Sequence, residues 1–239
     1  MGTMDNRYYF EKPIEIKELN VPFSFCLSGQ EAQHLLKVRR AKVGEKIVAF
    51  CGDGFDYNFE ITQIFKDKVD LNLLGKQQNK SFNAQNITVY LAMIKNEALV
   101  EAIDHLAELN VKTVKLFKAD YSVATFDEKK IEKLKQTAIQ ASKQSERADV
   151  MSIEIINKSQ IAKESNKNIF FAYENSTGKI DAFKGDFSLI VGPEGGFSAE
   201  EVEYFSSFAK NVSLGNTILR AHVACVAGVS MLKAVSYAC

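Results

Sequence analysis

From Asn86 onward, short apolar runs alternate with stretches of helical length and periodicity. The predicted strands are residues 87–94, 113–117, 169–172 and 187–191, and the predicted helices are residues 98–110, 127–147, 198–210 and 219–237. Parallel strands need a crossover connection, usually a helix, so this alternation predicts an α/β domain with a mostly parallel sheet. Ligands of such sheets bind at the carboxyl ends of the strands.

The first 75 residues follow a different pattern. The predicted strands there are residues 8–10, 46–50, 57–65 and 68–74, with a glycine turn at 51–54. Ser28 and Glu31 form a capping-box pattern, which predicts a short helix through Lys37. Short strands at close spacing indicate a small barrel or sandwich. We therefore predict a β-rich domain at residues 1–75, a polar linker at 76–85 and the α/β domain at 86–239.

Composition excludes several classes of protein. The chain is 46% hydrophobic and 25% charged, which is typical of a globular protein, and its 30 basic residues balance 30 acidic ones. No apolar run approaches the roughly 20 residues of a membrane helix, and the polar start has no signal-peptide core, so we expect a cytoplasmic protein. The four cysteines and three histidines lack metal-ligand spacing. This predicts reduced thiols and no metal site.

Positive charge is concentrated in residues 34–46. The five basic side chains there, against the single acidic Glu45, are Lys37, Arg39, Arg40, Lys42 and Lys46. Such a cluster can bind phosphates by releasing counterions, and it can equally be the solvated face of a helix. The neutral total charge excludes indiscriminate nucleic-acid binding but not a local site.

The most informative motif is the sequence LIVGPEGGFS at residues 189–198. A buried strand leads into a glycine-rich loop and then into a helix, whose start is marked by the capping-box pair Ser198 and Glu201. Glycines let the backbone approach a ligand closely, although a tight strand-to-helix turn would need them as well. Neither the GxxxxGK[ST] nor the GxGxxG phosphate motif is present, so a P-loop or Rossmann site is not expected.

A second loop follows about twenty residues later, with the sequence VSLGNTILR at residues 212–220. It leads into AHVACVAG, a helix of small residues suited to close packing against the sheet or against a partner subunit. Two backbone-rich loops at adjacent strand ends can hold a flat polar heterocycle through main-chain hydrogen bonds.

These motifs together closely resemble the RsmE family of 16S rRNA uridine N3-methyltransferases, in the SPOUT (trefoil-knot) superfamily. The segments that carry the resemblance are GPEGGFS, SLGNTILR, Arg7-Tyr8-Tyr9-Phe10, the HLLKV segment at 34–38 with Arg40, ELNV at 108–111, and Gln144-Ser145 with Arg147. The resemblance spans nearly the whole chain. It implies a PUA-like RNA-binding barrel, a knotted C-terminal domain that binds S-adenosyl-L-methionine (AdoMet), a homodimer, and 16S rRNA of the small ribosomal subunit as the substrate.

The resemblance also assigns roles to residues. The implied cofactor-binding residues are Glu174, Gly192, Glu194, Gly195, Gly196, Leu214, Gly215, Ile218 and Leu219. Together with the basic segment, the resemblance gives the candidate RNA-binding residues Arg7, His34, Lys37, Arg39, Arg40, Lys42 and Arg147, of which Arg40 aligns with a family arginine and Arg39 occupies a position that is usually apolar. Arg220 matches the arginine at the start of the family's last helix and is the first candidate catalytic residue.

The chain departs from the family pattern at several polar positions. The usual RTE is Arg220-Ala221-His222, LGPR becomes LGNT at 214–217, and the SER motif is Ala119-Asp120-Tyr121. Lys143 replaces the glutamate of EQS, and His105 replaces a lysine near ELGV. The cofactor glycines are retained while positions that face RNA have changed. AdoMet binding is therefore more firmly implied than the identity of the methylated base.

Methylation of uridine N3 requires the loss of a proton, so a general base or a cation that favours the uridine anion is needed. Arg220 can supply the charge, and we expect His222, with an ordinary pKa of about 6.5, to accept the proton in place of the family glutamate. The alternative for His222 is packing at a dimer interface. For the whole chain, the alternatives are an AdoMet enzyme that acts on another RNA base or position, a non-enzymatic RNA-binding protein and, more distantly, a nicotinamide oxidoreductase.

Overall fold

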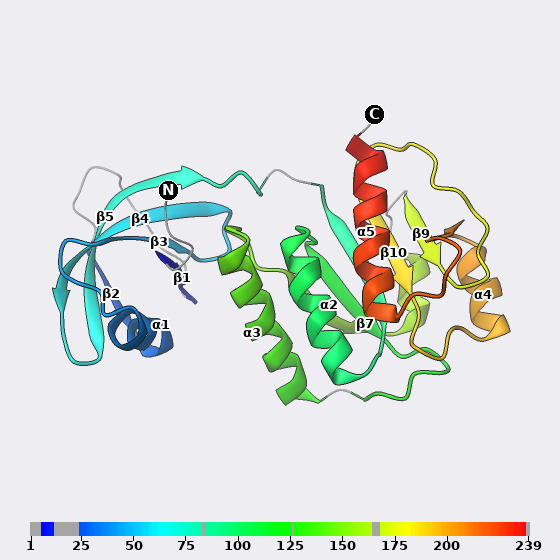
Figure 1. The fold of residues 1–239 in the computed structure, drawn as a ribbon, viewed down its shortest axis with the longest axis horizontal. Helices are drawn as coiled ribbons and strands as arrows, with labels where there is room; N and C mark the ends of the chain where they lie inside the picture. Colours follow the sequence, from blue (N-terminus) through cyan, green and yellow to red (C-terminus); the bar gives the residue numbers. More distant parts are fainter. Residues whose placement is uncertain (1–5, 12–23, 83–84, 126, 164–167, 238–239) are drawn as a thin grey trace. The chain divides into compact units, whose positions relative to one another are not determined.

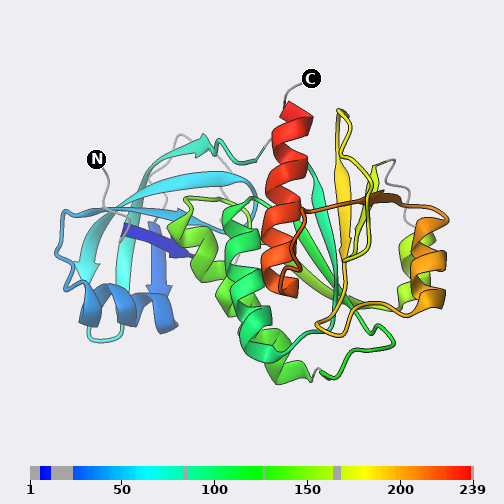
Figure 2. The same ribbon diagram turned by 45° about the vertical axis from the view of Figure 1, so that its right-hand side comes forward.

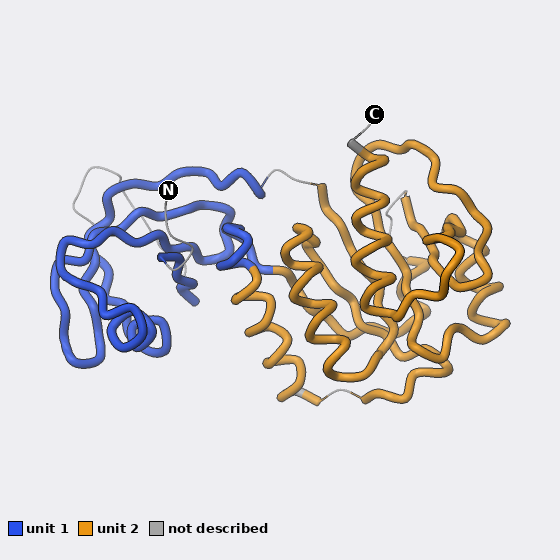
Figure 3. Tube along the Cα trace, in the orientation of Figure 1, with its two compact units in different colours: residues 1–83, 142–150 blue, residues 84–141, 151–239 orange. Residues whose placement is uncertain are grey.

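The computed structural model describes residues 6–11, 24–82, 85–125, 127–163 and 168–237. The chain divides into two compact units (Figure 3). Unit 1 comprises residues 1–83 and 142–150, and unit 2 comprises residues 84–141 and 151–239. The segment 142–150 therefore belongs with the β-rich unit, although the sequence pattern places it at the end of a helix of the α/β domain. The domain limits at 75 and 86 stay predictions.

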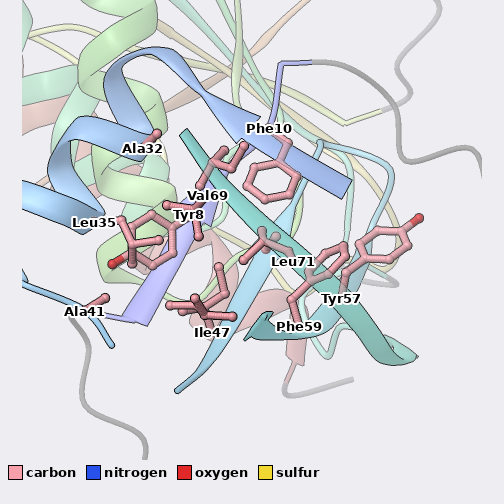
Figure 4. Close-up of a cluster of buried hydrophobic side chains, with 13 residues drawn as sticks. Tyr8, Phe10, Ala32, Leu35, Ala41, Ile47, Tyr57, Phe59, Val69 and Leu71 are labelled. Atoms are coloured by element: carbon pink, nitrogen blue, oxygen red, sulfur yellow. The ribbon is translucent and has the colours of Figure 1, made fainter. Parts of the chain in front are cut away.

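Unit 1 is built on a five-stranded sheet with the strand order β1-β3-β4-β5-β2. The strands are β1 (Arg7–Tyr9), β2 (Ser24–Ser28), β3 (Lys46–Phe50), β4 (Phe55–Ile64) and β5 (Lys68–Gln78). β1 pairs with β3 in parallel, and the other pairs are antiparallel. Side chains from all five strands form one apolar core, which includes Tyr8, Leu27, Ile47, Phe59 and Leu71 (Figure 4). The predicted small β-rich domain is confirmed.

Two expectations for strands in unit 1 need correction. β2 has no counterpart in the prediction, because it is short and only Leu27 of its five residues is buried. β5 continues to Gln78 instead of ending at residue 74, because its last residues pair with the start of β4, from Asn58 with Gly75 to Phe55 with Gln78. Pairing with a neighbouring strand, which a polar sequence does not reveal, sets this end of β5.

The predicted capping box at Ser28 is also wrong. Ser28 precedes α1 (Gly29–Gln33), but its side chain makes no capping hydrogen bond. The Glu31 carboxylate instead accepts two hydrogen bonds from Lys143 Nζ, at 2.9 and 3.0 Å. The helix continues as a π-helical turn, η2 (His34–Val38). Lys143, which stands where the family pattern has a glutamate, is thus matched by an acidic partner within unit 1.

Unit 2 contains a six-stranded parallel sheet with the order β11-β9-β10-β6-β7-β8. The strands are β6 (Ile87–Ala92), β7 (Thr113–Phe117), β8 (Ser152–Ile156), β9 (Ile169–Ala172), β10 (Phe187–Val191) and β11 (Lys210–Val212). The predicted strands 113–117, 169–172 and 187–191 are confirmed to the residue. The predicted α/β class with a mostly parallel sheet is confirmed as well.

The helices are α2 (Asn96–Glu108), α3 (Glu128–Gln144), α4 (Ala199–Ser206) and α5 (Ala221–Tyr237), with a 3₁₀ turn η3 (Lys158–Lys163). In unit 2, α2 and α5 lie side by side on one face of the sheet and α4 lies on the other (Figures 1 and 2). None of the helices in the described part of the chain is long and apolar enough to span a membrane. The predicted helix 198–210 is too long, because β11 begins at Lys210.

Side chains of the central strand β10 pack against helices on both faces of the sheet. Leu189 packs against α5 at Gly228, where a Cβ atom would lie 2.6 Å from the Leu189 Cδ2 atom. Ile190 belongs to a core cluster on the opposite face that contains Phe171 and Phe205 of α4. Successive strand residues point to opposite faces, so a strand that helices cover on both sides is buried along its whole length, as β10 is. The loop after β10 therefore begins at the end of a strand that is packed on both faces.

Candidate active site

A cavity of about 390 Å³ lies at the carboxyl ends of β9, β10 and β11. This volume is within the range of about 300–1,000 Å³ that small-molecule sites occupy. All nine residues implied as cofactor-binding line it, and so does Arg220; the nine are Glu174, Gly192, Glu194, Gly195, Gly196, Leu214, Gly215, Ile218 and Leu219. The two glycine loops, separated in the sequence, thus form two walls of one cavity.

The first wall is the loop after β10. A Cβ atom on Gly192 would lie 2.6 Å from the ring of Phe197, which is held by Phe171 and Phe205 at ring-centroid distances of 5.0 and 5.3 Å. Gly196 has a φ of +72°, and a Cβ atom there would lie 2.9 Å from Glu174 Oε1. Both positions therefore require glycine, the first by contact and the second also by backbone conformation.

Hydrogen bonds fix the ends of this loop. Glu194 Oε1 accepts a hydrogen bond from the backbone N–H of Lys95, in the loop after β6, at 3.1 Å. At the other end, Ser198 and Glu201 form the predicted capping box, with both reciprocal hydrogen bonds present at 3.2 Å. Glu194 thus lines the cavity and also ties two strand ends together.

The second wall is the loop between β11 and α5. The Ser213 N–H donates to the carbonyl oxygen of Gly178 at 2.8 Å, which anchors the loop to the segment after β9. Gly215 has a φ of +124°, and the space where its Cβ would stand is open. Ile218 is 86% exposed, an unusual position for a large apolar side chain unless a ligand or partner covers it.

The lining combines few charges with apolar surface. Glu174 and Glu194 supply two carboxylates, Arg220 supplies a guanidinium group, and Leu214, Ile218 and Leu219 supply apolar side chains. Backbone groups of the glycine loops make up much of the remainder. A site of this kind suits a flat ligand with both apolar and polar groups.

Two family models match the chain. One, described as an RNA methyltransferase domain, matches residues 81–233, and the other, described as an RNA methyltransferase PUA domain, matches residues 27–74. The chain belongs to the RNA methyltransferase family. The resemblance drawn from the sequence motifs is confirmed.

Relatives of this RNA methyltransferase cover nearly its full length. The proteins named ribosomal RNA small subunit methyltransferase E from Bacillus subtilis and Rickettsia conorii are 30% and 29% identical to it. The alignments cover 97% and 89% of this chain and 96% and 90% of the relatives.

Solved structures share the fold. A Legionella pneumophila methyltransferase, in complex with the bound cofactor SAM, has a TM-score of 0.85 at 24% identity, covering 96% of this chain and 97% of the other. The ribosomal RNA small subunit methyltransferase E of Neisseria gonorrhoeae, bound to S-adenosyl methionine, has a TM-score of 0.83 at 22% identity with the same coverage.

His222 does not line the cavity of this RNA methyltransferase. Ala221 and Ala224 of the same helix do line the cavity. Residues three apart lie on the same face of a helix, so this face of α5 is turned to the cavity and His222 lies on another face. Its Nε2 atom lies 3.5 Å from the Glu101 carboxylate of α2. The expectation that His222 accepts the substrate proton finds no support in this geometry.

Apart from Arg39, the implied RNA-binding residues fall into two groups. Arg7 and Arg147 are buried within unit 1: Arg7 pairs with Asp56 at 2.6 Å and donates to the carbonyl oxygen of Arg147 at 2.6 Å, and Arg147, 2% exposed, pairs with Asp149 at 3.0 Å. These two arginines hold unit 1 together and are not available to a phosphate. The exposed members are His34, Lys37, Arg40 and Lys42.

Arg39 is intermediate, with one guanidinium nitrogen 2.6 Å from the Asn6 side-chain oxygen. Arg40 has a φ of +52° and is exposed at the end of the π-helical turn. The basic segment is therefore neither a regular helix face nor uniformly available. Its exposed cations are Lys37, Arg40, Lys42 and Lys46, and His34 at the start of the segment is exposed as well.

The sequence pattern does not reveal a polar network that lies beside the site. The Ser198 hydroxyl donates to Asp120 at 2.6 Å, and Lys158 Nζ donates to Asp120 at 2.5 Å and to Glu201 at 2.8 Å. Hydrogen bonds from Lys158 and Ser198 lower the pKa of Asp120. Only the Ser198–Glu201 pattern is visible in the sequence, because Asp120 comes from the loop after β7 and Lys158 from the start of η3.

The described part of the chain was compared with the expectations for metal ligands and cysteines. No group of three or more His, Cys, Asp or Glu side chains there could hold a metal ion. Cys26, Cys51 and Cys225 form no disulfide bond, and burial raises the pKa of the Cys225 thiol. Cys239 lies outside the described residues.

Proposed function

We propose that this chain transfers the methyl group of AdoMet to N3 of a uridine in 16S rRNA of the small ribosomal subunit, in the cytoplasm and as a homodimer. The observation that carries the proposal is the cavity, in which the two glycine loops and Arg220 meet. Relatives named ribosomal RNA small subunit methyltransferase E, one 30% identical over 97% of the chain, support the substrate.

The cavity residues fit AdoMet. The volume of about 390 Å³ is adequate for a cofactor of this size, and glycine at 192 and 196 lets the loop pass close to Phe197 and Glu174, where a Cβ atom would collide. Leu214, Ile218 and Leu219 would cover the adenine ring, and Glu174 would accept hydrogen bonds from hydroxyl groups. When bound, AdoMet would supply a methyl group activated by its sulfonium.

The residues of the chain would contribute alignment and charge. Arg220 would place a guanidinium group near the base and favour the uridine anion that forms when N3 loses its proton. The apolar side chains of the second loop would exclude water, which strengthens that electrostatic effect. Because His222 faces Glu101, we expect Arg220 to carry the larger catalytic share.

The homodimer is supported by the outer face of α5. Val223 and Met231 are exposed apolar residues of this helix, and Ile218 precedes it. A contact with a second copy would cover these three side chains. Sedimentation equilibrium should give twice the chain mass of 26.7 kDa. A monomer at micromolar concentration would contradict the dimer.

A second candidate function is methylation of another RNA base or position by the same cofactor. The replacement of the family's RTE by Arg220-Ala221-His222, together with the position of His222 outside the cavity, favours it. Exocyclic amines and ring nitrogens of other bases need different proton acceptors from uridine N3. The two candidates share the AdoMet site and differ only in the nucleotide.

Calorimetric titration with AdoMet, followed by labelled methyl transfer to small ribosomal subunits that lack the modification, tests the proposal. We expect micromolar binding and label in 16S rRNA, with nuclease digestion and mass spectrometry locating it at uridine N3. Label at another nucleotide would select the second candidate. No AdoMet binding, with or without RNA, would refute the methyltransferase function and leave an RNA-binding protein.

A further inference from the structure

The loop after β7 places an aromatic side chain directly against the candidate active site. β7 is parallel to β6, and β6 is parallel to β10, so the loops after β7 and β10 leave the same edge of the sheet. A Cβ atom on Gly195 would lie 3.0 Å from Tyr121 Cβ and 3.5 Å from the Tyr121 carbonyl oxygen. Gly195 lines the cavity and Tyr121 does not, so Tyr121 lies next to a residue of the wall and outside the cavity itself.

The Tyr121 side chain is open to solvent. It is 53% exposed, whereas other large aromatic residues of unit 2, such as Tyr90 and Phe117, are almost fully buried. Among the described residues no ring contact, hydrogen bond or ion pair of the Tyr121 side chain is present. About half of this aromatic residue is thus open to solvent, next to the ligand cavity.

The backbone that carries the ring is held on both sides. The N–H of Asp120 donates to Glu201 Oε1 at 3.0 Å, and the Asp120 carboxylate accepts from Ser198 and Lys158. Ser122 forms two hydrogen bonds with the backbone of Ala119, at 3.0 and 3.1 Å. The loop is thus braced against the start of α4, which also ends the glycine loop. A braced loop loses little conformational freedom on binding a ligand.

Single-stranded RNA bases bind to proteins by stacking on aromatic rings or on guanidinium planes. An enzyme that modifies a base in folded RNA must remove it from its stack and hold it in the site. The Tyr121 side chain is about half exposed, is carried by a braced loop and lies next to Gly195 of the cavity wall.

We propose that Tyr121 stacks on an unpaired base of the RNA substrate, either the target base or its immediate neighbour. This inference rests on the proposed function and names the residue that holds the RNA at the site. It assigns to Tyr121 a role in RNA binding and none in AdoMet binding. Tyr121 acts through its aromatic ring, so its hydroxyl group is not needed.

Methyl transfer by Tyr121→Ala, Tyr121→Phe and a control, Val123→Ala, tests the role in the reaction. Val123 is exposed on the same loop, two residues further on. We expect Tyr121→Ala to lower kcat/KM about 10- to 100-fold, the usual loss for a stacked base, with AdoMet affinity unchanged. Tyr121→Phe and Val123→Ala should stay within about threefold of the unmodified chain. Equal rates for Tyr121→Ala and Val123→Ala would refute the proposal, and unchanged AdoMet affinity excludes misfolding.

Tyr121→Trp provides a second measurement that does not need catalysis. The chain contains no tryptophan, so this variant has a single one, at the proposed stacking position. Titration with protein-free, unmodified 16S rRNA transcript should quench its fluorescence in step with RNA binding, measured by anisotropy of labelled transcript. Emission that stays constant while RNA binds would refute stacking, even if the chain proves not to be a methyltransferase.

Association between copies is the competing explanation for the exposed ring. Dilution of Tyr121→Trp without RNA would then change its emission along with its sedimentation, and RNA would have no further effect. That result would assign Tyr121 to a protein contact and overturn the proposal. Emission independent of protein concentration, with quenching by RNA, supports it.

Discussion

Removal of the Glu201 carboxylate tests which contacts hold the loops beside the candidate active site in place. Glu201 is almost fully buried and accepts hydrogen bonds from the N–H groups of Ser198 and Asp120, at 3.2 and 3.0 Å, and from Lys158 at 2.8 Å. Its removal leaves two backbone donors and one ammonium group without this acceptor. The start of α4 and the loop that carries Tyr121 lose their common anchor.

The expected cost follows from these contacts. Breaking a buried ion pair by removing one partner costs about 3–5 kcal/mol, and the lower end applies because the Lys158 side chain is 36% exposed and keeps Asp120. We therefore expect Glu201→Ala to reduce the free energy of unfolding by about 3 kcal/mol. For a chain of this size, that lowers Tm by about 6–12 °C. Glu201→Gln, which keeps an acceptor oxygen, should lose about half as much.

Thermal melts followed by circular dichroism, with and without AdoMet, measure the effect. Glu203→Ala is the matched control, because Glu203 is an exposed glutamate on the same helix. We expect the control to change Tm by less than about 2 °C. A Glu201→Ala variant that melts with the control would refute the reasoning, since the network would then contribute nothing to stability.

Four further outcomes are expected. Gly196→Ala should weaken AdoMet binding in calorimetry at least about tenfold, because its φ of +72° disfavours alanine and a Cβ would meet Glu174; unchanged affinity would contradict this. The pKa of Asp120 is lowered in the folded chain, so its carboxylate contributes fully to stability above the ordinary Asp pKa of about 3.9 and loses this contribution as the pH falls through the lowered pKa. Asp120→Asn should therefore make the fall of Tm at acidic pH less steep, and an unchanged fall would mean that other groups cause it. The double variant Lys37→Ala with Lys42→Ala should reduce the slope of log K for RNA against log salt by about 1–2, whereas an equal slope would remove both lysines from the RNA interface. His222→Ala should keep the methylation rate within about tenfold, and a larger loss would restore His222 as the proton acceptor.

Some features of this protein follow from the sequence alone because they depend on near neighbours in the chain. The strands at 113–117, 169–172 and 187–191 are short runs of mainly apolar residues, and burial on both faces of a parallel sheet favours that pattern. The capping box at Ser198 and Glu201 is satisfied within three residues. The glycines of both loops can also be recognised in the sequence, because close backbone approach and positive φ restrict the residue type locally.

Edge strands show where local patterns end. β8 lies at one edge of its sheet with one buried residue, Ile153, so its sequence carries no strong periodicity. β2 has the same weakness. The capping-box pattern at Ser28 failed for a related reason, because Lys143, 112 residues away, takes the Glu31 carboxylate. An ion pair across the fold outweighed a local hydrogen bond worth about 1 kcal/mol.

Tertiary structure alone decided which side chains are available for function. Sequence similarity cannot distinguish the buried Arg7 and Arg147 from the exposed Lys37 and Lys42, because burial depends on residues that the fold brings from elsewhere, such as Asp56. The sequence supplied the strands, the glycine loops and the family. The fold joined the two loops into one cavity, turned His222 away from it and placed Tyr121 against Gly195, because such distances are set by packing between segments and not by order along the chain.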